Sequence, residues 1–403
     1  MSLAAQETMQ KDTLSEARLV GRATKKPAIL LSLHNDFGSV ENVWRRFEMT
    51  ADCFAFQTFE FLETWYRHLG ARSNIDVQIV VAWGAGGKPA MILPLGIESS
   101  GSLRRLIWLG NYVTDYNAPL LAPDFAQMVA PESFPALWND ICSILPAHDL
   151  VELMRQPALV GDQPNPFMEL KTQLNASGAH MTVLCEEFDD YYDRKRNAKA
   201  KRHFRSRRKK LQEIGETVYV HPETDAEIEA SVAKLVEFKS AALNAMGAWN
   251  FLEEPGYTDF YKELSVKSGA DGFAHVSHLE VGGEYVAGNW GLVHKGRFYY
   301  LVASYDGPNF GRFAPGVQAL VETMRWATEK GVSTFDFTIG DEAYKSEWCE
   351  KQIELFDHLK AATMKGVLTL AAEKAFLGAK RTIKQSPILW KMFTAVRSRF
   401  LSK

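Results

Sequence analysis

The sequence predicts a mixed α/β fold made of two related halves, and three observations support this. One order of elements (helix, hairpin with a Gly-Gly turn, strand, helix, strand) occurs twice, about 190 residues apart. The 403 residues exceed what one core usually holds. Hydrophobic residues make up 46% of the chain and aromatic residues 12%, which is enough for two full cores.

The first half opens with a helix, because Phe61, Leu62, Trp65 and Leu69 recur at helical spacing. Two apolar runs around Gly86-Gly87 then predict a hairpin. A third strand, a second helix and a last strand follow. In order, these elements are expected at residues 54–69, 77–83, 90–97, 104–111, 132–144 and 149–154.

The second half repeats the order. A helix is expected where Val232, Leu235, Val236 and Leu243 share one face, and a hairpin is expected around Gly282-Gly283. Lys330-Gly331 is a typical end of the second helix. The elements are expected at residues 225–246, 275–281, 285–293, 297–305, 317–329 and 334–339.

The remaining segments complete the expected division of the chain. A loose N-terminal arm precedes the first half, a crossing segment with a basic helix separates the halves, and a basic amphipathic helical tail ends the chain. These five parts are expected at residues 1–27, 28–180, 181–216, 217–366 and 367–403.

The composition favours a cytoplasmic protein without a metal. The N-terminal residues lack the apolar core of a signal peptide, and no run approaches the ~20 apolar residues that span a bilayer. The four cysteines are scattered, without metal-ligand spacing or a disulfide pattern. His275 and His278 fall on opposite sides of one expected strand, which is poor geometry for one metal ion.

Positive charge is concentrated in two segments. The net charge is −3, but residues 194–210 hold eleven Lys and Arg and no acid, and residues 367–403 hold eight against Glu373. Such asymmetry predicts anionic partners. In the basic helix an apolar stripe (Ala200, Phe204, Leu211) faces the body, and the cations expected to contact a partner are Arg202, Arg205, Arg208 and Lys209.

Several partners fit these cations. They are an anionic membrane surface, a nucleotide- or lipid-linked sugar, a cyclic dinucleotide and, less well, RNA. The tail has the pattern of a basic helix lying on the inner face of the cytoplasmic membrane, and equally that of a helix packed on the body.

Five segments together resemble one protein family. They are FQTFEFLETWYRHLG (56–70), TDYNAPLL (114–121), RSRRKKLQEIG (205–215), FGRFAPGVQALVETMRWATEKG (310–331) and FDFTIGDEAYKSEW (335–348). This ordered set resembles the CelD-like acetyltransferases of bacterial polysaccharide gene clusters. That family belongs to the GNAT superfamily and is similar to the Fem-type aminoacyl transferases. The resemblance implies two GNAT-like halves, with the second half catalytic.

The resemblance also implies acetyl-CoA, or another acyl-CoA, as donor. In GNAT proteins the diphosphate binds at a helix N-terminus, where free N–H groups and the helix dipole meet the phosphates. Here the corresponding loop holds Arg312, Phe313, Ala314 and Gly316, and Lys345 is a further phosphate candidate. Pro315 removes one N–H donor, so the loop also has the pattern of an ordinary helix start.

Acyl transfer needs a general base and a general acid. Asp336 lies between Phe335 and Phe337, so its side chain points away from theirs, and its carboxyl is either the base or a structural acceptor. Asp341 and Tyr344 follow closely. Tyr305 is the candidate acid for the leaving thiolate, within a segment that is also a strong turn.

The acceptor is expected between the halves. The candidates for its binding are Asp115, Tyr116, Asn117, Asn289 and Asp306.

The predicted function is acyl transfer, most simply of acetyl, to a sugar or amino sugar of an exopolysaccharide or envelope glycan precursor. One alternative is a Fem-type transferase that uses aminoacyl-tRNA. The other is a non-catalytic sensor or scaffold that binds a cyclic dinucleotide or an anionic lipid.

Overall fold

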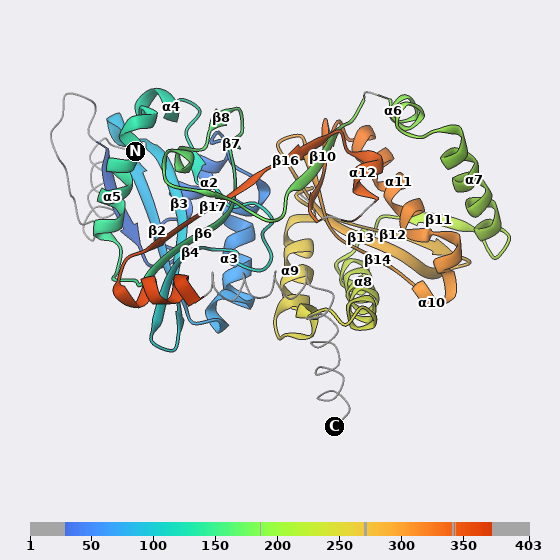
Figure 1. Ribbon diagram of the computed structural model, residues 1–403. Helices are drawn as coiled ribbons and strands as arrows, with labels where there is room; N and C mark the ends of the chain where they lie inside the picture. Colours follow the sequence, from blue (N-terminus) through green and yellow to red (C-terminus); the bar gives the residue numbers. More distant parts are fainter. Residues whose placement is uncertain (1–28, 186, 270–271, 341, 343, 373–403) are drawn as a thin grey trace, which may run out of the picture.

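The computed structural model describes residues 29–185, 187–269, 272–340, 342 and 344–372. It has two lobes, each built on one mixed sheet, and this confirms the α/β class expected from the sequence (Figure 1). The expected N-terminal arm and the tail from residue 373 lie outside the described residues.

The first-lobe sheet has the strand order β1-β2-β3-β4-β6-β17-β9, with β5 paired to β3. Helices α2, α3, α4 and α5 belong to this lobe. The strands are β1 (Leu30–His34), β2 (Ile75–Trp83), β3 (Pro89–Ser100), β4 (Leu103–Trp108), β5 (Leu120–Leu121), β6 (Leu150–Pro157), β9 (Gln173–Leu174) and β17 (Leu355–Ala361). The helices are α2 (Glu41–Glu48), α3 (Phe59–His68), α4 (Phe125–Met128) and α5 (Phe134–Ile144). A short hairpin of β7 (Leu159–Val160) and β8 (Gln163–Pro164) stands beside the sheet.

The second-lobe sheet has the strand order β11-β12-β13-β14-β15-β10-β16. Its strands are β10 (Ala179–Val183), β11 (Thr217–Val220), β12 (Ala274–Val281), β13 (Glu284–His294), β14 (Arg297–Tyr305), β15 (Thr334–Ile339) and β16 (Lys351–Ile353). Its helices are α6 (Phe188–Lys195), α7 (Ala198–Gln212), α8 (Asp225–Ala245), α9 (Tyr257–Gly269), α10 (Gly307–Phe310), α11 (Pro315–Glu329) and α12 (Lys345–Trp348).

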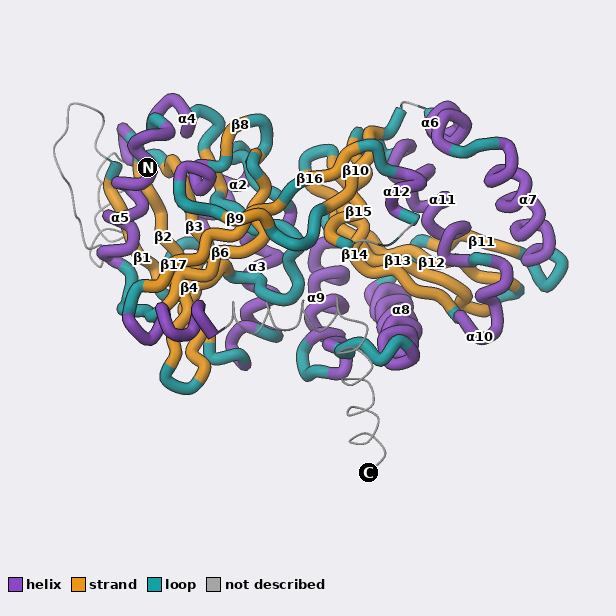
Figure 2. The backbone as a smooth tube through the Cα atoms, in the orientation of Figure 1, coloured by secondary structure: helices purple, strands orange, loops and turns teal. Residues whose placement is uncertain are grey.

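The lobes exchange strands. After β6 the chain crosses and adds β10 to the second-lobe sheet beside β15, and after β15 it crosses back and adds β17 to the first-lobe sheet beside β6. The two crossing segments pair with each other, β9 with β17 and β10 with β16 (Figure 2). β17, from the expected second half, therefore completes the sheet of the first lobe, and β10, which spans the expected boundary at residue 180, joins the sheet of the second lobe.

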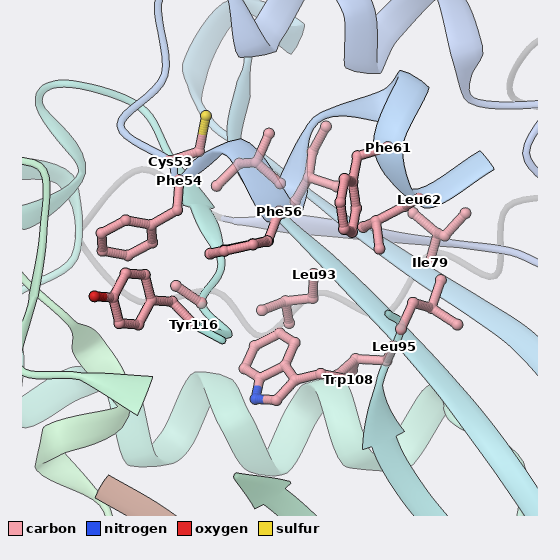
Figure 3. Packing of buried hydrophobic residues seen from close by; sticks show 14 of the residues in the cluster. Cys53, Phe54, Phe56, Phe61, Leu62, Ile79, Leu93, Leu95, Trp108 and Tyr116 are labelled. Atoms are coloured by element: carbon pink, nitrogen blue, oxygen red, sulfur yellow. The ribbon is translucent and has the colours of Figure 1, made fainter. Parts of the chain in front are cut away.

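One apolar core runs from the first lobe into the second. Phe56 of the first lobe packs edge-on against Tyr299 of β14, with 5.3 Å between the ring centroids. Phe61 of α3 meets Phe260 of α9 in the same way at 5.4 Å. Figure 3 shows Phe54, Phe56 and Tyr116 together in this core, with the Tyr116 hydroxyl pointing out of the cluster. The lobes are thus joined by core packing as well as by exchanged strands.

The helices and strands with regularly spaced apolar residues lie at the positions predicted from the sequence. Both predicted hairpins form, and Gly86, Gly87, Gly282 and Gly283 all have positive φ in their turns. The basic helix differs from its prediction, because it is broken after Arg196 into α6 and α7. Asn197 caps α7 by accepting a hydrogen bond from the N–H of Ala200.

Candidate active site

The second-lobe sheet opens between two parallel strands. β14 and β15 pair at residues 297–299 with 334–336, and α11 separates the two strands in the chain. Thr338, two residues past this pairing, has φ of 58°, which is strained backbone for a β-branched residue. A bulge in the pairing of β15 with β10 lies at the same place. The strands therefore diverge towards their C-terminal ends, where a substrate has room to enter.

The first lobe has an equivalent pair of parallel strands, but aromatic side chains fill the space beside them. β4 and β6 pair in parallel at residues 105–107 with 150–152, and α5 separates them in the chain as α11 does. Phe167 packs edge-on against Trp108 at the end of β4 and against Phe134 and Trp138 of α5. All four rings are buried. The aromatic cluster occupies the region between β4 and α5, so the second lobe has the usable opening.

A groove meets the N-terminus of α11 in the second lobe. It has a volume of about 600 Å³, and α7 forms one wall while Ala314, Val317 and Gln318 belong to the other. The backbone of Ala314 is left-handed, with φ of 50°, and Pro315 starts the helix. A Cβ on Gly316 would approach Tyr305 to 3.0 Å, so the small residue lets the ring of Tyr305 lie against the helix start.

The structure separates the predicted donor residues. Phe313 and Ala314 border this groove, and Arg312 borders an adjoining cavity with its guanidinium over the ring of Phe313. Gly316 is in the first turn of α11 beside Ala314. Lys345 lies elsewhere: it is buried, donates to the carbonyl of Ile339 at 2.7 Å and pairs with Glu342 at 3.0 Å. Lys345 thus belongs with the carboxylates at the end of β15.

Asp336 is fully buried between the lobes. Its carboxylate accepts hydrogen bonds from the Tyr116 hydroxyl at 2.8 and 3.0 Å and from the N–H of Thr338 at 2.8 Å. Burial raises its pKa to about 6, although Arg297, at 3.8 Å, lowers it. Its side chain does point away from Phe335 and Phe337, as expected. However, a carboxylate with no exposed surface is placed to hold the bulge and the other lobe rather than to meet an acceptor, which counts against its predicted role as base.

A second carboxylate, that of Asp115, lies close to the strand opening. It is half-buried at the C-terminal end of β15, where it accepts hydrogen bonds from the Thr338 hydroxyl and the N–H of Ile339. Burial raises the pKa of Asp115, and the hydrogen bonds and the nearby cations of Arg155 and Lys345 offset part of this rise. A carboxylate with a raised pKa at the C-terminal end of β15, beside the strand opening, has the properties of a general base.

Two tyrosines flank the opening. Tyr305 is 45% exposed at the end of β14, next to Gly316. Tyr344 borders the groove and packs against Phe337, and burial raises the pKa of its hydroxyl. Both remain candidates for the general acid. Asp341 lies outside the described residues.

The other predicted acceptor residues have structural contacts. The hydroxyl of Tyr116 bonds to Asp336, and Asn117 accepts from the Thr114 hydroxyl and donates to the carbonyl of Met154. Asp306 caps α10 by accepting from Asn309. Asn289 is fully buried and donates to the hydroxyls of Ser277 and Thr323. The structure thus brings Asp115 to the opening and gives the other four residues roles in holding the fold.

An exposed aromatic pair lies close to Asp115 in the chain and bridges the lobes. Tyr112, three residues before Asp115, is 57% exposed, and Trp249 of the second lobe is 62% exposed. Their rings meet edge-on with centroids 6.0 Å apart. Neither residue could be singled out from the sequence, because their proximity depends on how the lobes associate.

A larger cleft of about 1170 Å³ lies between the lobes near the other end of β14. Cys53 contacts His294 there, with 3.5 Å between sulfur and Nε2. Burial raises the pKa of the thiol to about 12 and lowers that of the imidazole to about 4. The thiol therefore stays protonated at neutral pH, and this pair is not an activated nucleophile.

The predicted anion-binding residues of α7 differ in their surroundings. Arg202, Arg205 and Lys209 are exposed, whereas Arg208 pairs with Glu322 of α11 at 2.9 Å. Ala200 and Phe204 are half-buried and Leu211 is buried, so the expected apolar stripe does face the body.

Comparisons with known proteins agree with the fold. The model of a family described as an acetyltransferase (GNAT) domain matches residues 198–346, which run from the start of α7 into α12. The crystal structure of FemX aligns with 81% of this chain and 96% of its own, with a TM-score of 0.55 and 12% identity. A conserved protein of unknown function from Bacteroides thetaiotaomicron aligns with 81% of this chain and 98% of its own, with a TM-score of 0.51 and 12% identity.

A third structure, the C-terminal domain of a putative lysylphosphatidylglycerol synthetase from Agrobacterium fabrum, aligns with 84% of this chain and 96% of its own, with a TM-score of 0.48 and 10% identity. At these identities the likeness concerns the fold. No curated protein sequence matches the chain. The fold is that of a two-lobed α/β protein, and residues 198–346, most of which lie in its second lobe, match the model of a GNAT acetyltransferase domain.

In the part of the chain that the structure describes, no group of three or more His, Cys, Asp and Glu side chains is arranged to hold a metal ion. No helix among the described residues has the length and apolar character to cross a bilayer.

Proposed function

We propose that this protein is an acyltransferase that moves an acyl group, most simply acetyl, from acyl-CoA to a hydroxyl or amino group of an exopolysaccharide or envelope glycan precursor. The observation that carries this is the opening between β14 and β15, with the N-terminus of α11 at the groove and the carboxylate of Asp115 at the end of β15. A tail bound to an anionic membrane would place the reaction at the inner face of the cytoplasmic membrane.

The donor enters from the groove. Its diphosphate lies at the N-terminus of α11, where the helix dipole and the N–H groups of the first turn favour negative charge. Pro315 supplies no N–H, so basic side chains around the groove must provide more of the attraction. The acyl arm then extends between the diverging strands towards the end of β15.

The acceptor approaches from the side of Asp115. Its oxygen or nitrogen attacks the thioester carbonyl carbon while its proton passes to the Asp115 carboxylate. The carbon–sulfur bond then breaks, and the thiolate leaves as free thiol after it takes a proton, for which Tyr305 and Tyr344 are the nearest candidates. Tyr112 and Trp249 offer apolar ring faces to a sugar.

The test is release of free thiol from acetyl-CoA, measured with a thiol reagent, in the presence of a panel of sugars and amino sugars. Acceptor-dependent release by the wild-type protein, lost in Asp115→Asn, supports the proposal. Release that is independent of every acceptor, or none with any acyl-CoA, contradicts it.

Replacing Lys345 with methionine should move the acidic limb of the rate profile to higher pH. The cation of Lys345 lowers the pKa of Asp115, so its removal raises that pKa further above its ordinary value. The base is active when deprotonated, so kcat/KM should reach half its plateau at a higher pH than in the wild type. Lys351→Met, an exposed lysine on β16, should leave the profile unchanged. An unshifted profile in Lys345→Met would exclude Asp115 as the group seen in this limb.

A Fem-type transferase that uses aminoacyl-tRNA remains the second candidate, and the exposed cations Arg202, Arg205 and Lys209 favour it. Copurification of tRNA, with affinity that falls steeply with salt, would support this candidate over an acyl-CoA donor.

A further inference from the structure

The inner face of α7 carries basic side chains beyond those that the sequence singled out. Lys199, His203, Arg207 and Lys210 follow one another at intervals of four, four and three residues, which places them on one face of the helix. All four are exposed. They line the groove of about 600 Å³ and an adjoining cavity of about 660 Å³, and His203 and Arg207 border both.

Positive charge dominates both spaces. Four lysines and arginines line the groove, against one acidic residue, Glu347. Glu347 pairs with Arg196. In the adjoining cavity Arg207, Lys210 and Arg312 stand against Glu213. Ile214, which is 51% exposed, gives this cavity an apolar surface as well. A ligand that fits here carries an anionic group and a flat or apolar body.

The cavity adjoins the groove at a defined place. Phe313 borders both spaces, and the next residue, Ala314, is the N-cap of α11. A diphosphate at the start of α11 would therefore leave the nucleoside to which it is attached within reach of Arg207, Lys210 and Arg312.

We propose that the adjoining cavity binds the phosphomonoester of a 3′-phosphorylated adenosine nucleotide, and that it thereby selects coenzyme A over nucleotides without this phosphate. Arg207 and Lys210 of α7 hold the 3′-phosphate together with Arg312. The adenine ring lies against the exposed side chain of Ile214. This inference rests on the proposed acyl-CoA donor and adds to it a role for the basic helix.

The outer face of α7 provides a matched control. Arg202 and Arg205 belong to the same helix and are exposed, but neither lines either of the two spaces. A nonspecific attraction of anions to the helix would depend on both faces, whereas a phosphate site depends on Arg207 and Lys210.

The experiment is calorimetric titration of the full-length protein with coenzyme A and with dephospho-coenzyme A, which differ in the 3′-phosphate alone. We expect the wild type to bind coenzyme A about tenfold or more tightly, because hydrogen bonds to a charged phosphate are of the stronger kind. In the double variant Arg207→Gln/Lys210→Gln, the preference for coenzyme A over dephospho-coenzyme A should be lost, so that the two ligands bind equally tightly. Arg202→Gln/Arg205→Gln should retain the preference.

The outcomes separate this inference from the proposed function. Equal binding of both ligands by the wild type overturns the 3′-phosphate site and leaves the acyl-CoA donor intact. The 3′-phosphate site is also overturned if the double variant still prefers coenzyme A to dephospho-coenzyme A. If neither ligand binds, the donor itself is wrong and the inference falls with it. The substituted residues are exposed, and a melting temperature close to that of the wild type would confirm that the variants are folded.

Discussion

Asp115→Asn should lower kcat/KM for acyl transfer about 100-fold or more, which is the usual contribution of a general base. The melting temperature should change by no more than about 2 °C, because the remaining amide oxygen can still accept a hydrogen bond from Thr338 or Ile339. Steady-state kinetics and a thermal unfolding curve on the same sample measure both quantities.

Asp336→Asn is the matched control, and we expect the opposite pattern. Asp336 holds Tyr116 and the backbone of Thr338 from a buried position, so its loss should cost about 1–3 kcal/mol of unfolding free energy. Its pKa of about 6 lies above the ordinary value of 3.8, so the folded protein binds this proton more tightly than the unfolded chain does. The contribution of Asp336 to the unfolding free energy therefore decreases as pH rises from about 4 to about 6, and asparagine removes this dependence.

These two variants decide which carboxylate is the base. If Asp336→Asn abolishes the rate without lowering stability while Asp115→Asn is nearly as active as the wild type, the roles are reversed.

The two lobes should unfold in one transition, and Leu355→Ala should destabilise both together by about 3 kcal/mol. Leu355 is fully buried in β17, the strand that residues following the second lobe contribute to the first-lobe sheet. The same core continues into the second lobe. Hydrogen exchange should therefore increase together in peptides from β3 and from β13. Calorimetry of the wild type should show a single peak.

Lys360→Gln is the control for this change, because Lys360 is an exposed residue of the same strand. We expect its effect to stay within about 0.5 kcal/mol. Two separate unfolding transitions in the wild type would contradict the account, as would faster exchange confined to the first lobe in Leu355→Ala.

Much of the fold could be predicted from the sequence, because it depends on local signals. The glycine pairs at 86–87 and 282–283 mark two hairpins, and the spacing of apolar residues marks α3, α8 and α11. The exchanged strands β10 and β17 could not be predicted in this way. A short strand carries no local mark of which sheet it joins, since distant residues supply its partners.

The candidate site could also be predicted only where it depends on local sequence. Alternation along β15 correctly predicts that Asp336 points away from Phe335 and Phe337. This alternation cannot show that Tyr116 of the other lobe donates a hydrogen bond to Asp336. Nor can it show that Asp115 lies at the opening between β14 and β15.

The groove-facing cations of α7 did have a signal in the sequence. The apolar stripe at Ala200, Phe204 and Leu211 shows which side of the helix meets the body. Lys199, His203 and Lys210 each immediately precede one of these residues, so they lie at the edge of that side.

Calorimetric titration of the wild-type protein with acetyl-CoA, repeated on Arg312→Ala, tests the acyl-CoA site directly. We expect one site per chain, because the aromatic cluster around Phe167 fills the equivalent region of the first lobe, and we expect weaker binding by Arg312→Ala. Two sites per chain, or no binding at all, would contradict a single acyl-CoA site at the N-terminus of α11.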